Sequence, residues 1–353
     1  MLEDFSGPPA NPSSIHYFGQ RARSLLSKAR QTTASFFDVK PEEVVFTSGG
    51  TEAIDLMIHS LPQRGHLITT AIEHSAVYKA VQALEAQGWD IDYIPCGLWG
   101  APLPDPIERV IRPTTRAFIF SASNGETGVK SDLEGIANLA ERHKIPLLVD
   151  AVSFLGKEPL KMHPGITALS LAGHKFHGPK GIGALIVRSH YKILPLFTGG
   201  GQELHRRAGT ENLSGILGLA EALTILNERQ VEISQQILDL RSHLEMEILR
   251  HVPDVAIHGQ GPRICNTLNV AFLGVEGESL LMHLDMAGIA VSHGSACSSG
   301  ALEPSRVLIQ MGIDRKIARS SIRISLSRLN TREEIHLFLD KITHLIAKLR
   351  KTL

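Results

Sequence analysis

The chain has 353 residues, of which 43% are hydrophobic and 20% charged, a composition typical of a soluble globular protein of about two domains. Lys plus Arg and Asp plus Glu each total 36, so no basic face for nucleic acid is indicated, and no apolar stretch reaches the length of a membrane span. The first residues lack the basic and apolar regions of a signal peptide, and Cys96, Cys265 and Cys297 form no CxxC pair. These features favour a reducing cytoplasm over a disulfide framework or a zinc site.

Apolar runs alternate with helical patterns from about residue 42 to 230, which predicts an α/β fold with a mostly parallel sheet flanked by helices. The predicted strands are 43–46, 66–70, 91–94, 117–121, 146–150, 168–171 and 183–187, and the clearest helices are 52–59, 76–87 and 133–143.

A long helix is expected at 213–250, with a polar break near 227–229, followed by a smaller region with strands at 266–272 and 323–326 and a closing amphipathic helix at 332–349. We therefore predict a large domain at 12–230 and a smaller C-terminal α+β domain at 231–353. The segment 1–11 is expected to pack near the smaller domain.

The stretch 173–181 carries the strongest chemical signal, because Lys175 stands between His174 and a glycine-rich turn. Most loop lysines are solvated charges, but an amine at the rim of a sheet can form a Schiff base with a carbonyl cofactor. Asp150 closes the apolar run 145–149, where a carboxylate is costly unless it meets a cation. The pyridinium nitrogen of pyridoxal phosphate is such a cation, and the lysine and the carboxylate together are typical of enzymes that use this cofactor.

Other polar residues follow predicted strands, so they converge on the edge of the sheet where ligands bind. The segment 48–52, with Gly50 and Thr51, opens a helix and could be a phosphate cup or a simple capping box. His74 could be a satisfied histidine at a strand end, or a ring stacked on a flat cofactor and able to transfer protons.

Two further residues are candidates for substrate chemistry. Cys297 lies among small polar residues at 292–300, which predicts an exposed, mobile loop and a reactive thiolate, although most single cysteines are buried and inert. Arg328 follows a predicted strand and could bind a substrate carboxylate with two parallel hydrogen bonds, or be a surface arginine.

Together these residues resemble NifS/IscS-type cysteine desulfurases, which belong to the class V, fold-type I enzymes that use pyridoxal phosphate. The match runs from about residue 11 to 329 and rests on the motifs NPSSIHYFGQ, FTSGGTEA, AIEHSAV, VDAV, GHKFHGPKG, GGGQE, RAGTEN, NTLNV, SHGSACSSGALEPS and SLSRLN. The resemblance implies that Lys175 is the Schiff-base lysine, Asp150 the partner of the pyridine nitrogen, His74 the stacking residue and Cys297 the cysteine that takes up sulfur. It also implies a cofactor contact for Asn124, phosphate contacts for Gly50, Thr51 and His174, a phosphate contact across a homodimer for Thr210, and substrate-carboxylate binding for Arg328.

Four departures from the family pattern are visible. The usual first strand is absent, Ser153 replaces a glutamine after the pyridine aspartate, Ala172 replaces a serine before the lysine, and Gly125 replaces the second of two asparagines. Each lost charge-assisted hydrogen bond is worth about 1.5–3 kcal/mol, so we expect weaker cofactor binding than is typical of the family.

The resemblance implies conversion of L-cysteine to L-alanine, with a persulfide on Cys297 that passes to an acceptor such as an iron–sulfur scaffold protein. Two alternatives stay open on the sequence. One is another reaction on the same fold, such as that of a selenocysteine lyase, a β-lyase or an aminotransferase. The other is a degenerate homologue that acts only as a binding partner.

Overall fold

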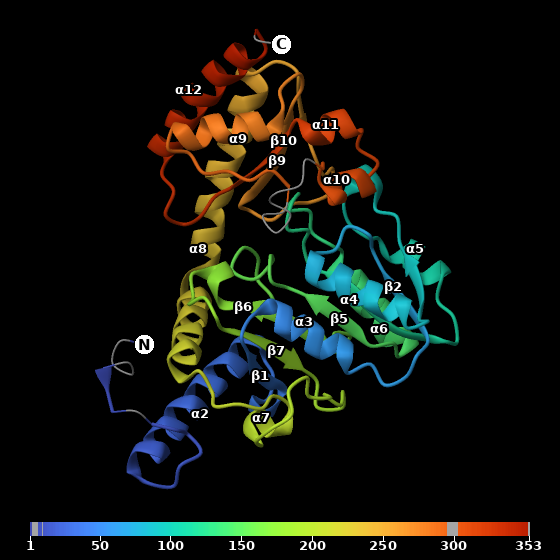
Figure 1. Cartoon of the computed structure of the whole chain (residues 1–353), viewed down its shortest axis with the longest axis vertical. Coiled ribbons are helices and arrows are strands. Elements are labelled where there is room, and N and C mark those ends of the chain that lie inside the picture. The colour runs from blue at the N-terminus through green and yellow to red at the C-terminus, as the bar shows by residue number, and fades with distance from the viewer. Residues whose placement is uncertain (2–5, 9, 295–302, 352–353) are drawn as a thin grey trace.

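The computed structural model describes residues 1, 6–8, 10–294 and 303–351. Within these residues a seven-stranded sheet and a three-stranded sheet are joined by the long helix α8 (Leu213–His251), which runs from beside the large sheet up to α12 in Figure 1. The strands of the large sheet are β1 (Val44–Thr47), β2 (His66–Thr69), β3 (Asp90–Tyr93), β4 (Thr115–Ser121), β5 (Leu147–Asp150), β6 (Ala168–Ala172) and β7 (Gly183–Val187). Its helices are α2 (Tyr17–Phe37), α3 (Gly50–His59), α4 (Ser75–Ala86), α5 (Pro104–Arg109), α6 (Leu133–His143) and α7 (Gln202–His205), with short 3-10 turns η1 (Pro41–Glu43), η2 (Gly97–Trp99) and η3 (Gly173–Phe176).

The large sheet has the strand order β1-β7-β6-β5-β4-β2-β3. Strands β2 to β6 pair in parallel, whereas β7 is antiparallel to both β1 and β6. Because β1 therefore runs in the same direction as β6, the carboxyl ends of β1, β2, β4, β5 and β6 lie at one edge of the sheet. The predicted α/β fold with a mostly parallel sheet is confirmed.

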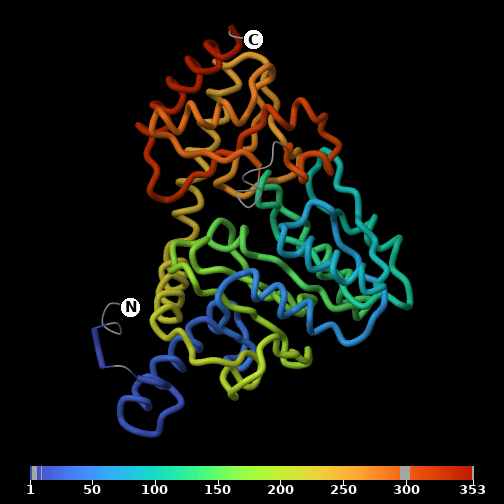
Figure 2. Tube along the Cα trace, viewed as in Figure 1, coloured from blue at the N-terminus to red at the C-terminus, as the bar shows by residue number. Residues whose placement is uncertain are grey.

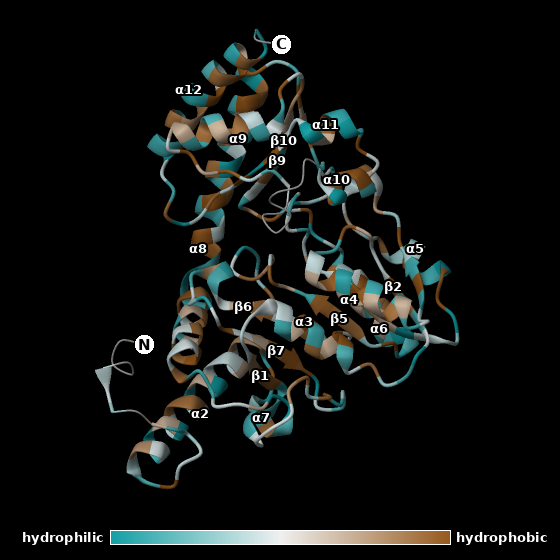
Figure 3. Ribbon diagram, viewed as in Figure 1, coloured by the Kyte–Doolittle hydropathy of each residue, from teal (hydrophilic) through white to brown (hydrophobic). Residues whose placement is uncertain are grey.

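Apart from the edge strand β3, the sheet is buried on both faces because its strands are mostly apolar, as the brown strands in Figure 3 show. Neighbouring residues of β4 point to opposite faces, so Phe118 packs in the cluster with α2, α6 and α8, whereas Ile119 packs in the cluster with α3 and α4. This two-sided core fixes the edge at which the polar residues emerge.

The smaller sheet is antiparallel and has the order β10-β9-β8. Its elements are β8 (Val255–Ile257), β9 (Thr267–Phe272), β10 (Ser321–Ser325), α9 (Gly277–Met286), α10 (Arg306–Gln310), α11 (Arg315–Arg319) and α12 (Arg332–Leu349). Ile233 and Leu244 of α8 pack with Val270 of β9 and Ile342 of α12 in a separate core. Figure 2 shows α12 at the opposite end of the molecule from α2.

The predicted long helix is confirmed by α8, and the polar residues 227–229 do not interrupt it. These three residues are exposed and lie between Leu226 in the first core and Ile233 in the second. They are polar because the helix crosses from one core to the other there. The proposed domain boundary at residue 230 lies close to this crossing and stays a prediction. Met1, in the N-terminal segment, lies beside Gly218 in the first half of α8.

None of the helices in the described ranges combines the length and the apolar character needed to cross a lipid bilayer.

Candidate active site

Asp150 is the last residue of β5, and its side chain is almost fully buried at the carboxyl edge of the sheet. Its Oδ1 accepts hydrogen bonds from the Val152 N–H at 2.9 Å and from the Ser170 hydroxyl at 3.4 Å. Burial raises the pKa of the Asp150 carboxyl, and the nearby charges of His74 and Lys175 oppose that rise. A ligand cation at this point would therefore stabilise the carboxylate.

The turn from β1 into α3 provides an anion site beside Asp150. Gly49 is the N-cap residue and has no side chain to cap the helix, so the first amides of α3 face outward at the positive end of the helix dipole. A Cβ on Gly50 would lie 2.5 Å from Cγ2 of Val152, so only glycine allows this helix to approach the turn after Asp150 so closely. Thr51 is exposed in the first turn of α3.

Lys175 lies in η3, the short turn that leaves the end of β6. The turn is compact, because a Cβ on Gly173 would lie 3.0 Å from the carbonyl oxygen of Pro179. Lys175 and His174 are exposed and line a cavity of about 360 Å³. Asp150 and Lys175 are close enough to interact electrostatically, so both can reach one bound cofactor.

His74 is the N-cap residue of α4 and not the end of a strand, since β2 ends at Thr69. Its Nδ1 accepts the backbone N–H of Ala76 at 3.1 Å, which places the proton of a neutral ring on Nε2. The exposed ring is thereby fixed at the same edge as Asp150.

The Asn124 amide is committed to the protein backbone. Its Nδ2 donates to the carbonyl of Ile72 at 2.9 Å, and its Oδ1 accepts from the N–H groups of Glu126 and Thr127. The buried Asn124 therefore shapes the turn after β4, and its predicted cofactor contact stays a prediction.

Two of the departures from the family pattern face each other. A Cβ on Gly125 would lie 3.0 Å from Oγ of Ser153, and both residues line the cavity that contains Lys175. Ala172, the third departure, is buried at the end of β6. Gly125 and Ser153, each smaller than the residue expected from the family, therefore lie in close contact at one side of the cavity.

Two arginines from the smaller sheet complete the cavity wall. Arg328 lies three residues beyond the end of β10 and is half-buried. Arg323, within β10, donates from Nη1 to the carbonyl of Gly125 at 2.9 Å. The structure therefore brings Lys175, Ser153 and Arg328 together around one space.

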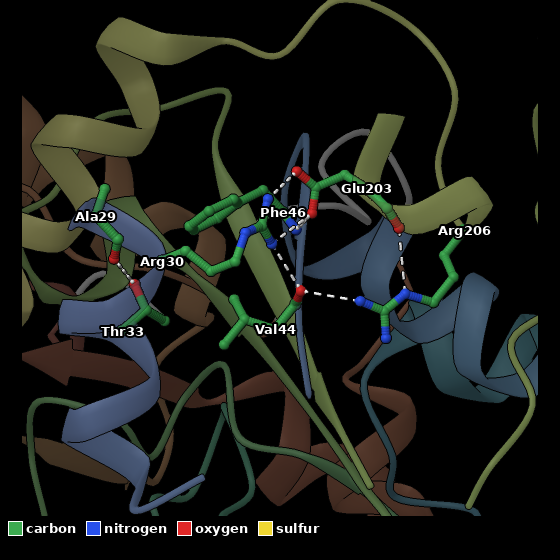
Figure 4. A network of polar contacts seen from close by, with 7 residues as sticks. All are labelled: Ala29, Arg30, Thr33, Val44, Phe46, Glu203 and Arg206. Carbon is green, nitrogen blue, oxygen red and sulfur yellow. Dashed lines mark hydrogen bonds and ion pairs between the residues drawn. The ribbon is translucent and has the colours of Figure 1, made fainter. Parts of the chain in front are cut away.

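Thr210 does not line that cavity among the described residues; it is exposed in the segment between α7 and α8. Figure 4 shows how α7, which precedes this segment, is held: buried Glu203 accepts two hydrogen bonds from Arg30, at 2.6 and 2.9 Å, and one from the Phe46 N–H. Arg206 donates to the carbonyl of Val44. These contacts fix a left-handed turn of three non-glycine residues, with φ of 48° at Glu203.

Cys297 lies outside the described residues. The other two cysteines are buried and free, and burial raises the pKa of the Cys96 thiol to about 12 and that of the Cys265 thiol to about 11. Neither is poised as a thiolate nucleophile.

Three further residues lie at the site: Glu73, which the sequence placed among the polar residues at the strand ends without a role, and Arg306 and Lys157, which it did not single out. Glu73 is buried beside His74, and Arg306 of α10 donates to the backbone carbonyls of Ala71 and Glu73. Lys157 donates to the carbonyl of Lys175, and burial together with the Lys175 charge lowers the pKa of its amine to about 8. Lys157 follows a glycine in an irregular stretch, so only its position in three dimensions reveals it.

The model of the class-V aminotransferase family matches residues 1–338. The chain belongs to the class-V aminotransferase family. It is 38% identical over 348 residues to the cysteine desulfurase IscS of Dictyoglomus turgidum, covering 96% of this chain and 88% of that protein. The IscS of Methanosarcina thermophila is 38% identical over 357 residues, covering 99% and 87%.

Solved structures agree with this family assignment. A NifS-like protein superimposes with a TM-score of 0.91 at 32% identity, covering 99% of this chain and 94% of that one. A NifS-like protein from Rickettsia africae gives a TM-score of 0.87 at 28% identity, covering 96% and 92%. The resemblance predicted from the motifs is confirmed.

Proposed function

We propose that this protein is a cysteine desulfurase that uses pyridoxal phosphate to convert L-cysteine to L-alanine. The observation that carries the proposal is the buried Asp150 carboxylate, which lies within electrostatic reach of the Lys175 amine and beside the uncapped start of α3. The names of the relatives support the same activity.

The donor set fits the cofactor at three points. The uncapped amides of α3, with Thr51 and His174, suit a phosphate; Asp150 suits a protonated ring nitrogen; and Lys175 suits an aldehyde. When bound, the cofactor supplies an imine-forming aldehyde and an electron-withdrawing ring. In our proposal Asn124 and Ser153 also lie along the cofactor, and Thr210 contacts the phosphate of the neighbouring subunit in a homodimer.

Different residues of the chain then have different roles in the reaction of L-cysteine. Arg328 binds the substrate carboxylate and thereby orients it, Lys175 accepts the α-proton, and His74 donates or accepts a proton from Nε2. The Cys297 thiolate attacks the substrate sulfur as the carbon–sulfur bond breaks, and the electron pair of that bond stays with the β-carbon, which is then protonated, while Lys175 returns the α-proton to the α-carbon. The balanced result is L-alanine and a persulfide on Cys297, which passes to an acceptor protein in the cytoplasm.

The test is an assay of L-cysteine with a reductant, following alanine and sulfide. We expect both products from the wild type, and neither from Lys175→Ala, which should also lack visible cofactor absorbance. Lys180→Ala, in the same glycine-rich turn, is the matched control and should remain active. Cys297→Ala should bind the cofactor and release no sulfide.

Other outcomes would assign the alternatives. Pyruvate in place of alanine would indicate a β-lyase, and faster turnover of selenocysteine would indicate a selenocysteine lyase. A protein that stays colourless with added pyridoxal phosphate would contradict the proposal and favour a non-catalytic binding partner.

A further inference from the structure

Glu73 is a buried carboxyl group that the proposed reaction does not use. It lies between β2 and α4, directly before His74, and its residue is 2% exposed. Its Oε2 accepts the backbone N–H of Ser121 at 2.8 Å and the Ser121 hydroxyl, and its Oε1 accepts the Thr70 hydroxyl at 2.7 Å. Three donors thus fix the carboxyl group in one orientation.

The same serine connects Glu73 to Asp150. Ser121 ends β4 and is the register partner of Asp150 in β5, and the N–H of Ala122 donates to the Asp150 carbonyl at 2.8 Å. Two buried carboxyl groups therefore lie on adjacent strand ends, close enough for the Asp150 charge to act on Glu73. Burial, with the Asp150 charge adding to it, raises the pKa of the Glu73 carboxyl to about 7.

The other groups that face Glu73 come from three elements. The Cys96 thiol feels the Glu73 charge, His74 follows in the chain, and the Arg306 guanidinium of α10 binds the Glu73 main-chain carbonyl at 2.5 Å. The side chain itself meets hydroxyl and amide donors. The Ser121 and Thr70 hydroxyls can either donate to a carboxylate or accept from a protonated carboxyl, so Glu73 can change charge without moving.

We propose that Glu73 is a positioning residue that acts through Asp150 to strengthen the binding of a protonated ring nitrogen at the carboxyl edge of the sheet. The inference rests on the proposed function, because the ring nitrogen belongs to pyridoxal phosphate. An ionised Glu73 adds negative charge beside Asp150, so a cation there is bound more tightly. A neutral Glu73 gives no such help.

The experiment compares the wild type with Glu73→Gln, whose amide can keep all three hydrogen bonds but cannot ionise. The dissociation constant of pyridoxal phosphate is measured by visible absorbance from pH 5.5 to pH 9. At pH 5.5, where Glu73 is neutral, we expect equal affinities; at pH 9 we expect the variant to bind about tenfold more weakly, the equivalent of about one pKa unit of charge interaction. A ratio that does not change with pH would overturn the proposal.

Two controls separate charge from structure. Glu73→Asp keeps the charge and should keep the pH dependence of the wild type, even if its affinity is lower at every pH. Ser121→Ala removes a hydrogen bond that lowers the pKa of Glu73, so the pH dependence should remain but move to higher pH. If the wild type itself binds no cofactor, the proposed function fails, whereas binding with a constant ratio rejects the role of Glu73 alone.

Discussion

The two sheets place different charged groups near the cavity between them. The edge of the large sheet presents three buried carboxyl groups, Asp150, Glu73 and Glu126, and burial raises the pKa of each. The smaller region presents arginines, of which Arg306 and Arg323 act on Glu126.

Comparing the contacts of the three carboxyl groups shows which of them can pair with a bound ligand. Ser305 and Arg306 at the start of α10, and Arg323 in β10, bind groups of the turns near Glu73 and Glu126. The groups that can bring positive charge to Asp150 are Lys175 and a protonated His74, both exposed. Asp150 is therefore the carboxyl group at this edge best placed to receive a cation from a bound molecule.

The largest expected effect comes from neutralising that carboxyl group. Asp150→Asn removes the partner of the ring nitrogen, and breaking a buried charge pair costs about 3–5 kcal/mol, so we expect a loss of about a thousandfold in kcat/KM for L-cysteine. Asp90→Asn changes an exposed aspartate paired with Arg112 and should leave the rate unchanged. Comparable losses in both variants would show that the effect is not specific to the site.

Glu73→Gln should change how stability depends on pH in the cofactor-free protein. The pKa of Glu73 is raised in the folded state, so the unfolded state releases its proton first and stability falls as pH rises from about 4.5 through 7. The loss should amount to about 3 kcal/mol and be absent in the variant. Urea unfolding at pH 5 and pH 8 measures this loss of unfolding free energy. The same difference between the two pH values in the wild type and the variant would contradict the assignment.

His258, buried in the smaller region, should make stability change with pH in the opposite direction. Its Nε2 lies 2.9 Å from Oγ of Ser321, and burial lowers the pKa of the ring to about 4. The unfolded state therefore gains a proton first as pH falls, so stability is present above about pH 6.5 and is lost towards pH 4, by about 3 kcal/mol. His258→Gln should remove this acid sensitivity in urea unfolding at pH 4.5 and pH 7; an unchanged difference would show that other groups cause it.

Arg306→Gln should loosen the contact between the two regions. The guanidinium binds the carbonyls of Ala71 and Glu73 and lies 4.0 Å from the ring centre of Tyr78. We expect a loss of about 2 kcal/mol in unfolding free energy and faster hydrogen exchange at residues 71–74. Arg315→Gln breaks an exposed pair with Glu303 and should cost less than about 1 kcal/mol. Equal losses of unfolding free energy in the two variants would show that Arg306 contributes no more to stability than an exposed arginine.

The smallest expected effect is a gain. Ser153→Gln restores the larger side chain of the family pattern in the wall of the cavity and should tighten pyridoxal phosphate binding by about tenfold through one added hydrogen bond. Absorbance titration measures the change. Weaker binding would show that this space is needed for the substrate or the cofactor.

Much of the large sheet could be predicted from the sequence because its buried strands are continuous apolar runs, and Asp150 stands out as a charge at the end of one. The roles of Asn124 and Glu73 could not be predicted in this way. The Asn124 amide is fixed by the backbone of Ile72, 52 positions away, and the Glu73 carboxyl group by Ser121, 48 positions away. Contacts between residues so far apart in the sequence leave no local pattern. Lys157 was missed for the same reason, since its contact with Lys175 spans 18 positions.

The most direct test of the account is to reduce the protein with borohydride in the presence of pyridoxal phosphate and map the modified peptide by mass spectrometry. Reduction fixes the cofactor to the amine that holds it. We predict a single pyridoxyl group on Lys175 and an unmodified Lys157, although both amines line the same cavity. Modification of Lys157 in place of Lys175, or of no lysine at all, would contradict the central claim.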